Sequence, residues 1–402
     1  MTSEWHEVPL RELVGYISKG IAPSYAEEAS ESTIRVLNQK CNRNFRISYG
    51  DSRLHDTLKK KVPPERYVKP DDILINSTGA GTAGRIAQIE DVPSATTIDG
   101  HMILIRSNRK VTQKFLGYAL KAHQWEVLQL DEGSTGQTEL NRDRLLDEIM
   151  INYPVSFDEQ NAIVGTLESI DRKLIVNEQL NDNLEQQAQA IYHERFETIS
   201  PNDLPSEWRI VTLGEVATIS SKSFNPLKEP EILLEHYSIP AFDEARFPVF
   251  ELSTSIKSNK FIIDASCFMI SKLNPTTKRV WKPYCLTGNA VCSTEFIVYK
   301  AKDKTITDFL YSVIDSNSFS DFMCSHVTGS TGSRQRTTPS DTLSYELILP
   351  SGDELAEFQS LVSPMYAQIR INAIENDRLK RLRDSLLPKL MSGEIDVFTI
   401  QL

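Results

Sequence analysis

EWHEVPLRE at residues 4–12 returns as EWRIVTLGE at residues 207–215, an offset of 203. GSTG at residues 133–136 returns at residues 329–332, an offset of 196, and each copy reaches a proline 18 residues later. A period near 200 is far longer than the roughly 20–50 residues of a solenoid repeat. The repeat therefore indicates a duplicated domain, each copy of which is followed by a long polar helical segment.

Length and composition are those of a soluble globular protein with more than one domain. The chain has 402 residues, of which 40% are hydrophobic and 25% are charged. Its start has no signal-peptide pattern, and no apolar run approaches the roughly 18 residues of a membrane span. The five cysteines form no C-x-x-C pair, which favours reduced thiols without a zinc site. We expect a cytoplasmic protein with no membrane partner.

The formal net charge of −11 counts against a free-standing nucleic-acid binder, which usually carries a basic surface. Charge can nevertheless be local, and a partner subunit can supply much of the phosphate contact. The acidic balance therefore does not exclude DNA binding.

Hydrophobic patterning predicts the same order of elements in both copies. In the first copy we expect strands at residues 72–76, 101–105 and 149–154. A helix is predicted over 114–130, with one apolar stripe formed by Phe115, Tyr118, Ala119, Ala122 and Trp125. The second copy repeats this order with strands at 267–271, 295–299 and 347–350 and a helix over 307–323. The loops between these elements do not match, as expected for two binding modules with different targets.

Each copy is followed by a long segment with apolar residues at alternating steps of three and four, which predicts a coiled-coil seam. The first seam runs through Ile163, Leu167, Ile170, Leu174, Asn177, Asn181, Leu184, Ala188 and Ile191. The second runs through Phe358, Val362, Met365, Ile369, Asn372, Asn376, Leu379, Arg383 and Leu386. The four asparagines correspond at an offset of 195, and polar seam residues fix register. Pro364 should lie in a first turn or kink the second helix.

These patterns predict an α+β (mixed α/β) fold with two similar globules and two long helices that pair as an antiparallel coiled coil, with approximate twofold symmetry. The expected order is a globule at 1–155, a helical region at 156–200, a globule at 201–351 and a helical region at 352–402. About 40 helical residues at 1.5 Å each make a rod of about 60 Å. Such a rod suits two half-sites of a DNA duplex about 34 Å apart. The alternative is two amphipathic helices packed on separate globules.

One motif resembles a nucleotide-binding loop. Residues 79–84 match G-x-G-x-x-G, but a dinucleotide site needs a helix to begin there. Residues 85–89 predict a strand instead, and the second copy has no glycines at residues 273–281. A strand-connecting loop that faces DNA is the favoured interpretation. The sequence has no Walker A, H-E-x-x-H or G-x-S-x-G motif, so we expect no catalytic residues and no metal site.

Basic and polar residues recur at corresponding loops of the two copies, and these residue types suit contacts to bases and phosphates. The candidates for DNA contact in the first copy are Asn76, Ser77, Thr78, Arg85, Ser134, Thr135, Gln137, Thr138, Asn141 and Arg142. Those in the second copy are Lys272, Asn274, Lys278, Arg279, Ser330, Thr331, Ser333, Arg334, Gln335 and Arg336. Each could equally be an ordinary solvated loop residue.

The ordered set of motifs resembles the specificity (S) subunit of type I restriction–modification systems. It comprises the duplicated E-W-x-x-V-x-L-x-E openings, SKLNP at residues 271–275, STEFIV at 293–298, the two GSTG loops, and LLPKLMSGEI at 386–395. The resemblance covers essentially the whole chain.

This resemblance implies that each globule is a target recognition domain for one half of an asymmetric, bipartite DNA site. It implies that the helices space the half-sites and dock two methyltransferase (M) and two restriction (R) subunits. The partners would supply adenine-N6 methylation and ATP-dependent cleavage, together with S-adenosylmethionine, ATP and Mg. The chain itself would be a non-catalytic specificity subunit with no cofactor.

Two other functions stay open from the residues alone. One is an enzyme that uses nucleotide or S-adenosylmethionine at the Gly79–Gly84 loop. The other is a coiled-coil protein adaptor without DNA contact.

Overall fold

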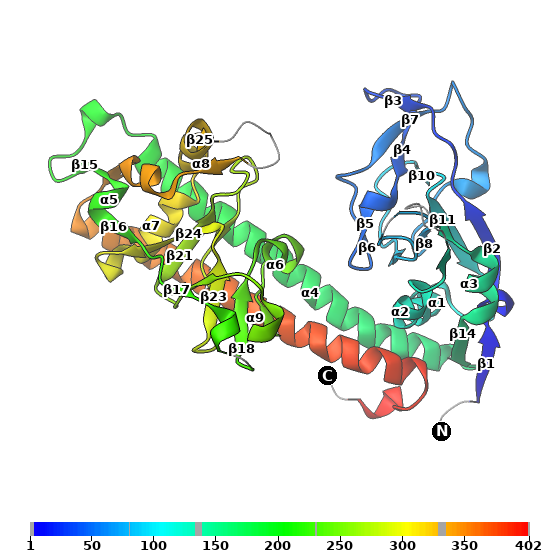
Figure 1. Cartoon of the computed structure of the whole chain (residues 1–402). Helices are drawn as coiled ribbons and strands as arrows, with labels where there is room; N and C mark the ends of the chain where they lie inside the picture. The colour runs from blue at the N-terminus through cyan, green and yellow to red at the C-terminus, as the bar shows by residue number, and fades with distance from the viewer. Residues whose placement is uncertain (1–3, 80, 133–138, 230, 329–334, 401–402) are drawn as a thin grey trace. The chain divides into compact units, whose positions relative to one another are not determined.

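The computed structural model describes residues 4–79, 81–132, 139–229, 231–328 and 335–400 (Figure 1). The fold is α+β, as predicted. Contacts divide the chain into two compact units: unit 1 comprises Met1–Arg172 and Leu379–Leu402, and unit 2 comprises Lys173–Arg378. Each unit therefore combines one globule with part of both long helices. The four regions expected from the sequence, with boundaries at residues 155, 200 and 351, stay a prediction.

Unit 1 is built on two four-stranded sheets. The first has the order β2 (Val14–Lys19), β11 (Met102–Ser107), β8 (Ile73–Asn76) and β9 (Ile86–Gln88). The second has the order β10 (Thr96–Ile98), β4 (Thr33–Leu37), β7 (Arg53–Asp56) and β3 (Tyr25–Ala26). Two-stranded pairs join β1 (Trp5–Pro9) to β14 (Met150–Pro154), β5 (Asn42–Arg43) to β6 (Arg46–Ile47) and β12 (Asp131–Glu132) to β13 (Glu139–Leu140). Its short helices are α1 (Gln113–Ala122), α2 (Gln124–Val127) and α3 (Arg142–Glu148).

Unit 2 repeats this plan. One sheet has the order β16 (Ala217–Ile219), β24 (Phe296–Ala301), β21 (Cys267–Ser271) and β22 (Val280–Trp281). The other has the order β17 (Ser223–Phe224), β20 (Lys260–Ile262), β23 (Ala290–Ser293), β18 (Leu233–Tyr237) and β19 (Val249–Leu252). The pairs are β15 (Arg209–Thr212) with β27 (Glu346–Leu349) and β25 (Val327–Thr328) with β26 (Arg336–Thr337). The short helices are α5 (Leu213–Val216), α6 (Ile239–Ala245), α7 (Thr307–Ile314) and α8 (Asn317–Ser325).

The strand registers match between the two copies. Met102 lies opposite Asn76 in unit 1, and Phe296 lies opposite Ser271 in unit 2, at offsets of 194 and 195. In each copy one pair of strands is parallel, β4 with β10 and β18 with β23. The predicted strands are confirmed at β8, β11 and β14 and at their counterparts β21, β24 and β27. The duplicated sequence thus folds into two copies of one framework.

The opening motif fastens each copy at its edge. Strand β1 pairs with β14, and the amide of Leu10 donates to the carbonyl of Ile149 at 2.8 Å. The counterpart in unit 2 is the amide of Leu213, which donates to the carbonyl of Tyr345, also at 2.8 Å. The repeated motif therefore has a structural role in both copies. Its strand pairs the start of each globule with the strand that precedes a long helix.

The predicted helix over 114–130 was wrong in length. It is broken at His123 into α1 and α2, and Trp125 is 74% exposed instead of lying on the buried stripe. The reason is local: the side chain of Gln124 donates to the carbonyl of Gly84 at 2.8 Å and accepts from the amide of Ile86 at 2.9 Å. These bonds turn α2 toward the Gly79–Gly84 loop. The predicted helix over 307–323 is likewise broken between α7 and α8, where Ser316 caps α8.

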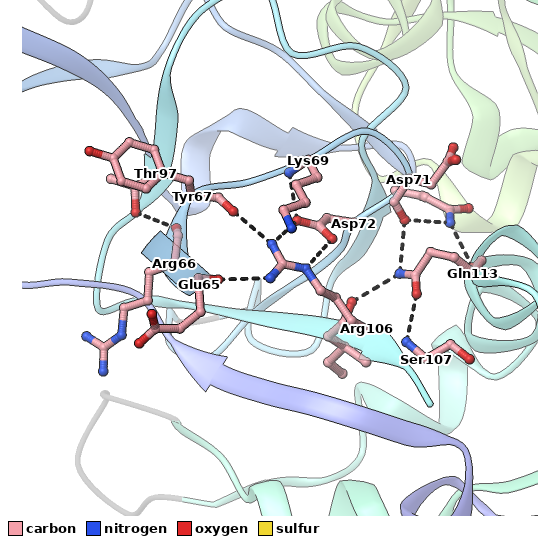
Figure 2. Close-up of polar contacts among 12 residues, drawn as sticks. Glu65, Arg66, Tyr67, Lys69, Asp71, Asp72, Thr97, Arg106, Ser107 and Gln113 are labelled. Atoms are coloured by element: carbon pink, nitrogen blue, oxygen red, sulfur yellow. Dashed lines mark hydrogen bonds and ion pairs between the residues drawn. The ribbon is translucent and has the colours of Figure 1, made fainter. Parts of the chain in front are cut away.

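A cation at the end of one central strand holds a turn in both copies. In unit 1 the guanidinium of Arg106 donates twice to Asp72, at 2.7 Å each, and to the carbonyls of Glu65 and Tyr67 (Figure 2). In unit 2 the corresponding Lys300 pairs with Asp264 at 2.5 Å. A charge-assisted contact at this place fixes the chain that enters the buried strand β8 or β21.

The long helices are α4 (Phe157–Tyr192), which a π-helical turn at His193–Glu197 extends, and α9 (Gly352–Met391). They run antiparallel, because Asn177 contacts Asn376 whereas Asn181 contacts Asn372. Of the two positions expected for Pro364, the first turn is excluded, because the residue lies in the interior of α9. A kink near Val362 stays a prediction. Both helices also pack on the globules, since Ile163 and Leu167 lie in the same core as Leu116 and Leu390.

Gly20 is required where β2 leaves its sheet. A Cβ atom there would lie 2.1 Å from the carbonyl oxygen of Asp99 and 2.2 Å from that of Ile98. We expect Gly20→Ala to lower the free energy of unfolding by about 1–3 kcal/mol, because neither backbone can yield without breaking the bonds between them. Urea unfolding would measure the loss. Gly165→Ala is the matched control, since nothing lies within 4 Å of its Cβ position.

Candidate nucleic-acid interface

Loops from several elements of unit 1 meet at one end of the central sheet. Because β2, β11 and β8 are antiparallel neighbours, the end of β2, the start of β11 and the end of β8 lie together. Thr78 pairs with Glu139 across an isolated bridge, Glu139 forms an ion pair with Lys19, and Thr78 Oγ1 lies 2.8 Å from His101 Nδ1. We call this set the first edge: Lys19, Asn76, Ser77, Thr78, His101 and Glu139.

In unit 2 the corresponding loops also lie together, but they carry different residues. Leu273 pairs with Arg336, the amide of Asn274 donates to the carbonyl of Gln335 at 2.9 Å, and Arg336 binds Glu295 through two bonds of 2.9 and 3.0 Å. We call this set the second edge: Lys272, Leu273, Asn274, Glu295, Gln335 and Arg336. The strand after the GSTG loop carries a carboxylate at the first edge and a guanidinium at the second.

Several of the first-copy candidates for DNA contact make hydrogen bonds within the protein. Asn76 and Ser77 are fully buried. The side-chain Nδ2 of Asn76 donates to the carbonyl of Gln39, and its Oδ1 accepts from Nδ2 of Asn42. Asn141 caps α3 by accepting from the amides of Asp143 and Arg144. Arg85 is partly exposed and Arg142 is exposed. Among the described residues, the first-copy candidates that are at least partly exposed are therefore Thr78, Arg85, Asn141 and Arg142.

Most candidate cations of the second copy have a carboxylate partner. Lys278 pairs with Asp315 at 3.0 Å, and Arg279 binds Asp243 through bonds of 2.5 and 2.9 Å. Hydrogen bonding with Glu295 raises the pKa of Arg336. Lys272 is half-buried, and Asn274 has a left-handed backbone with a φ of 48°. The second copy therefore presents oriented but largely neutralised cations.

Eight candidates lie outside the described residues: Ser134, Thr135, Gln137, Thr138, Ser330, Thr331, Ser333 and Arg334. The strands that flank these segments are described in both copies. They form short ladders, β12 with β13 and β25 with β26.

The Gly79–Gly84 loop does not have the surroundings of a dinucleotide site. It leads into β9, which pairs antiparallel with β8, so the residues that follow the loop form a strand where a dinucleotide site requires a helix to begin. The positive φ angles of Gly79, Gly81 and Gly84 serve a tight strand connection, and a Cβ at Gly84 would lie 2.9 Å from the carbonyl of Val127. The loop therefore connects β8 to β9, which confirms the predicted strand connection. It also packs against α2.

The four seam asparagines meet in one polar layer within unit 2. Asn177 Nδ2 donates to Asn376 Oδ1 at 2.8 Å, and Asn372 Nδ2 donates to Asn181 Oδ1 at the same distance. Asn376 also donates to the carbonyl of Leu174, and Asn181 to that of Ile369. Residues of α4 and α9 that differ by 195 in number make the same bonds. The bond from Asn177 to Asn376 corresponds to that from Asn372 to Asn181. The bond from Asn376 to Leu174 corresponds to that from Asn181 to Ile369. The layer is thus locally twofold symmetric.

In each unit a long helix contacts the globule at a corresponding position, but the residue there is Asp171 in unit 1 and Tyr366 in unit 2. In unit 1, Asp171 accepts from Tyr118 at 2.9 Å, Lys121 at 3.0 Å and Arg383 at 3.0 Å. In unit 2, the corresponding Tyr366 hydroxyl lies 2.8 Å from Ser312 Oγ. Burial alone would raise the pKa of Asp171, but Lys121 and Arg383 hold it below its usual value. Burial lowers the pKa of Lys121.

The sequence reading missed a basic segment in the first copy. Residues 38–72, between β4 and β8, contain nine Lys and Arg against five Asp and Glu, although the whole chain is acidic. The corresponding residues 238–266, between β18 and β21, contain three basic and four acidic residues. The run of three lysines at 59–61 was the signal that could have revealed the difference.

Among the described residues, no group of three or more His, Cys, Asp or Glu side chains is arranged to hold a metal ion. No described helix has both the length and the apolar character needed to cross a bilayer.

Comparison with known proteins agrees with this architecture. Residues 2–186 match the family model for the type I restriction modification DNA specificity domain. The MjaIX specificity subunit of Methanocaldococcus jannaschii is 25% identical over 96% of this chain and 92% of its own length. The HindI specificity subunit of Haemophilus influenzae is 33% identical over 23% of this chain and 20% of its own length.

The fold has a solved counterpart. The S subunit of a type I restriction–modification system from M. genitalium superposes with a TM-score of 0.58 and 15% identity, over 97% of this chain and 96% of that one. This likeness concerns the fold, with two similar globules and two long helices. Residues 2–186 therefore carry a type I restriction modification DNA specificity domain, and nearly the whole chain is similar to the specificity subunit of a type I restriction enzyme.

Proposed function

We propose that the chain is the DNA sequence-recognition subunit of a type I restriction–modification complex, and that it reads a bipartite, asymmetric duplex. The observation that best supports this function is that the two copies share one strand framework, whereas the residues of the first edge and the second edge differ. The strand registers of the two copies coincide, whereas the first edge carries Glu139 where the second carries Arg336. Two readers of this kind suit two different half-sites. A palindrome would need two identical readers.

The proposed partners are double-stranded DNA, two methyltransferase subunits and two restriction subunits. Two identical partners need two equivalent docking surfaces, and the helices offer a locally twofold arrangement around the asparagine layer. The proposed register residues are Asn177, Asn181, Asn372 and Asn376. S-adenosylmethionine, ATP and Mg would belong to the partners, and this chain would perform no catalysis.

The decisive experiment is expression of the operon in a host that lacks adenine methylation, followed by sequencing of modified adenines. The expected result is one motif with two unlike halves at a fixed spacing. Absence of any modified bipartite motif would contradict the function. Saturable binding of S-adenosylmethionine to the isolated chain would instead favour the enzyme alternative. Binding of partners without salt-dependent duplex binding would favour the protein adaptor.

Arg336 is the candidate base reader that the structure best supports, because Glu295 orients its guanidinium beside the second edge. We expect Arg336→Ala to weaken duplex binding by the assembled complex by about 1–3 kcal/mol and to relax selectivity at one base pair. Binding to a set of single-base variants of the target would measure this. Arg11→Ala is the matched control, since Asp147 binds the Arg11 guanidinium through bonds of 2.5 and 2.9 Å and Arg11 is not a candidate for DNA contact. Equal weakening on every sequence would assign Arg336 to phosphate contact.

A further inference from the structure

The most exposed large apolar side chain among the described residues lies beside three consecutive lysines. Leu58 is 83% exposed, and Lys59, Lys60 and Lys61 are all exposed. They follow β7 in a turn that the second copy does not reproduce, since no run of basic residues occurs within residues 238–266. The framework of unit 1 does not need these side chains in a core.

The turn is built to hold its shape. Asp56 Oδ1 accepts from the amides of Leu58 at 2.9 Å and Lys59 at 3.4 Å. The buried ring of His55 accepts from the amide of Ser24 at Nδ1, so its Nε2 donates to the carbonyl of Lys60 at 2.8 Å. Thr57 donates to the carbonyl of Ser32 through its hydroxyl at 2.6 Å. These bonds fix the backbone from which the three exposed lysine side chains extend.

The turn is linked to the first edge through a short piece of chain. Lys60 Nζ donates to the carbonyl of Ala22 at 2.8 Å. Ala22 is three residues beyond Lys19, which pairs with Glu139 at the first edge. Between them, Gly20 and Ile21 are bound to the turn that carries His101, because their amides donate to the carbonyls of Met102 and Ile98. Lys60 is therefore connected to the first edge through the segment from Lys19 to Ala22.

The charges of the turn are less neutralised than those around the second edge. Lys59 has one carboxylate partner, Asp56 at 3.8 Å, and Lys60 binds only a carbonyl among the contacts described for it. Within the described residues, Lys61 has no hydrogen bond or ion pair. By contrast, Arg279 and Arg336 are each bound by a carboxylate through two bonds. Unpaired cations at an exposed turn attract phosphate groups most strongly.

We propose that the turn of residues 57–61 is a DNA phosphate clamp of the first recognition domain, with no counterpart in the second. This inference rests on the proposed DNA-reading function. It assigns much of the sequence-independent, salt-sensitive affinity to one half of the molecule. The second domain then contributes mainly selectivity through its oriented polar side chains.

The test uses the complex assembled with methyltransferase subunits and measures duplex affinity over a range of salt concentrations. The variant carries Lys59→Gln, Lys60→Gln and Lys61→Gln. Each lost phosphate contact should make the slope of log K against log salt shallower by about 0.9, so a change of about 2–3 is expected. Affinity for target and unrelated duplexes should fall by the same factor.

Two controls isolate the charge. Leu58→Ser changes the tip of the turn without changing its charge, and Lys257→Gln removes an exposed lysine of the second copy. Both should leave the slope near the wild-type value. An unchanged slope in the triple variant, with target binding intact, would overturn the phosphate clamp and leave the proposed function standing. Loss of subunit assembly by the triple variant would also overturn it, because the turn would then contact protein. A wild-type complex that binds no target would end both proposals.

Discussion

Asp171→Ala is expected to lower the free energy of unfolding of unit 1 by about 3–5 kcal/mol, because it leaves the buried Lys121 without its counter-ion and leaves Arg383 with Asp384 alone. Lys121 and Arg383 each donate to this carboxylate at 3.0 Å, and their side chains are only 9% and 13% exposed. Tyr118 loses its acceptor as well. Urea unfolding gives the size of the loss, and hydrogen exchange in α1 and α4 locates it.

The matched control is Tyr366→Phe, at the corresponding position of unit 2. It removes one hydroxyl that lies 2.8 Å from Ser312, so a loss of about 1 kcal/mol is expected. A loss below about 1 kcal/mol for Asp171→Ala would show that the contact contributes little to the joint between helix and globule.

The effect of Asp171→Ala should also depend on pH. The folded-state pKa of Asp171 lies below the ordinary value of 3.8. The stability that its ionised form contributes is therefore complete above pH 3.8 and is lost as the pH falls through the folded-state value. Wild type and variant should differ fully at neutral pH and converge in acid.

Replacement of Val176 and Ile371 by Glu is expected to prevent docking of the proposed methyltransferase subunits while the chain stays folded. The two residues correspond at an offset of 195, lie on different helices and are 54% and 55% exposed. Matched exposed apolar side chains beside the asparagine layer suit two copies of one partner. Burying a carboxylate at an interface centre should cost about 2 kcal/mol or more at each site, roughly a 30-fold loss of affinity.

The single substitutions make this test sharper. Val176→Glu alone should leave one partner bound, and so should Ile371→Glu alone, which mass measurement of the complex would reveal. Leu382→Glu is the control, since Leu382 is 39% exposed but corresponds to Gln187 in the other helix. Full assembly of the double variant would place the docking surface elsewhere.

The framework was predictable because it depends on local patterns that occur twice. Alternation and apolar runs located β8, β11, β21 and β24, and steps of three and four located α4 and α9. The break in the helix at His123 was not predictable, because the side chain of Gln124 turns inward to satisfy the backbone of Gly84 and Ile86. Distant backbone groups decide such a break, and no local pattern reports them.

The candidate DNA-contact residues were harder to sort from sequence. Residue type alone placed Asn76 and Arg85 in the same group, yet Asn76 is fully buried and bonded while Arg85 reaches the surface. Likewise, the cations of the second copy gave no sign that Asp243 and Glu295 neutralise Arg279 and Arg336. Side-chain partners separated by 36 and 41 residues are set by packing.

By itself, the duplicated EW motif with its matched seams determined two copies of one framework and the antiparallel helix pair, since apolar periodicity and recurrence are properties of the chain. The tertiary structure alone decided which polar groups stay available to a ligand. It buried Asn76, paired Arg336 with Glu295 and left the lysines of residues 59–61 exposed. The reason is physical: burial and ion pairing are settled between segments far apart in sequence, where each polar group must find a partner or remain in water.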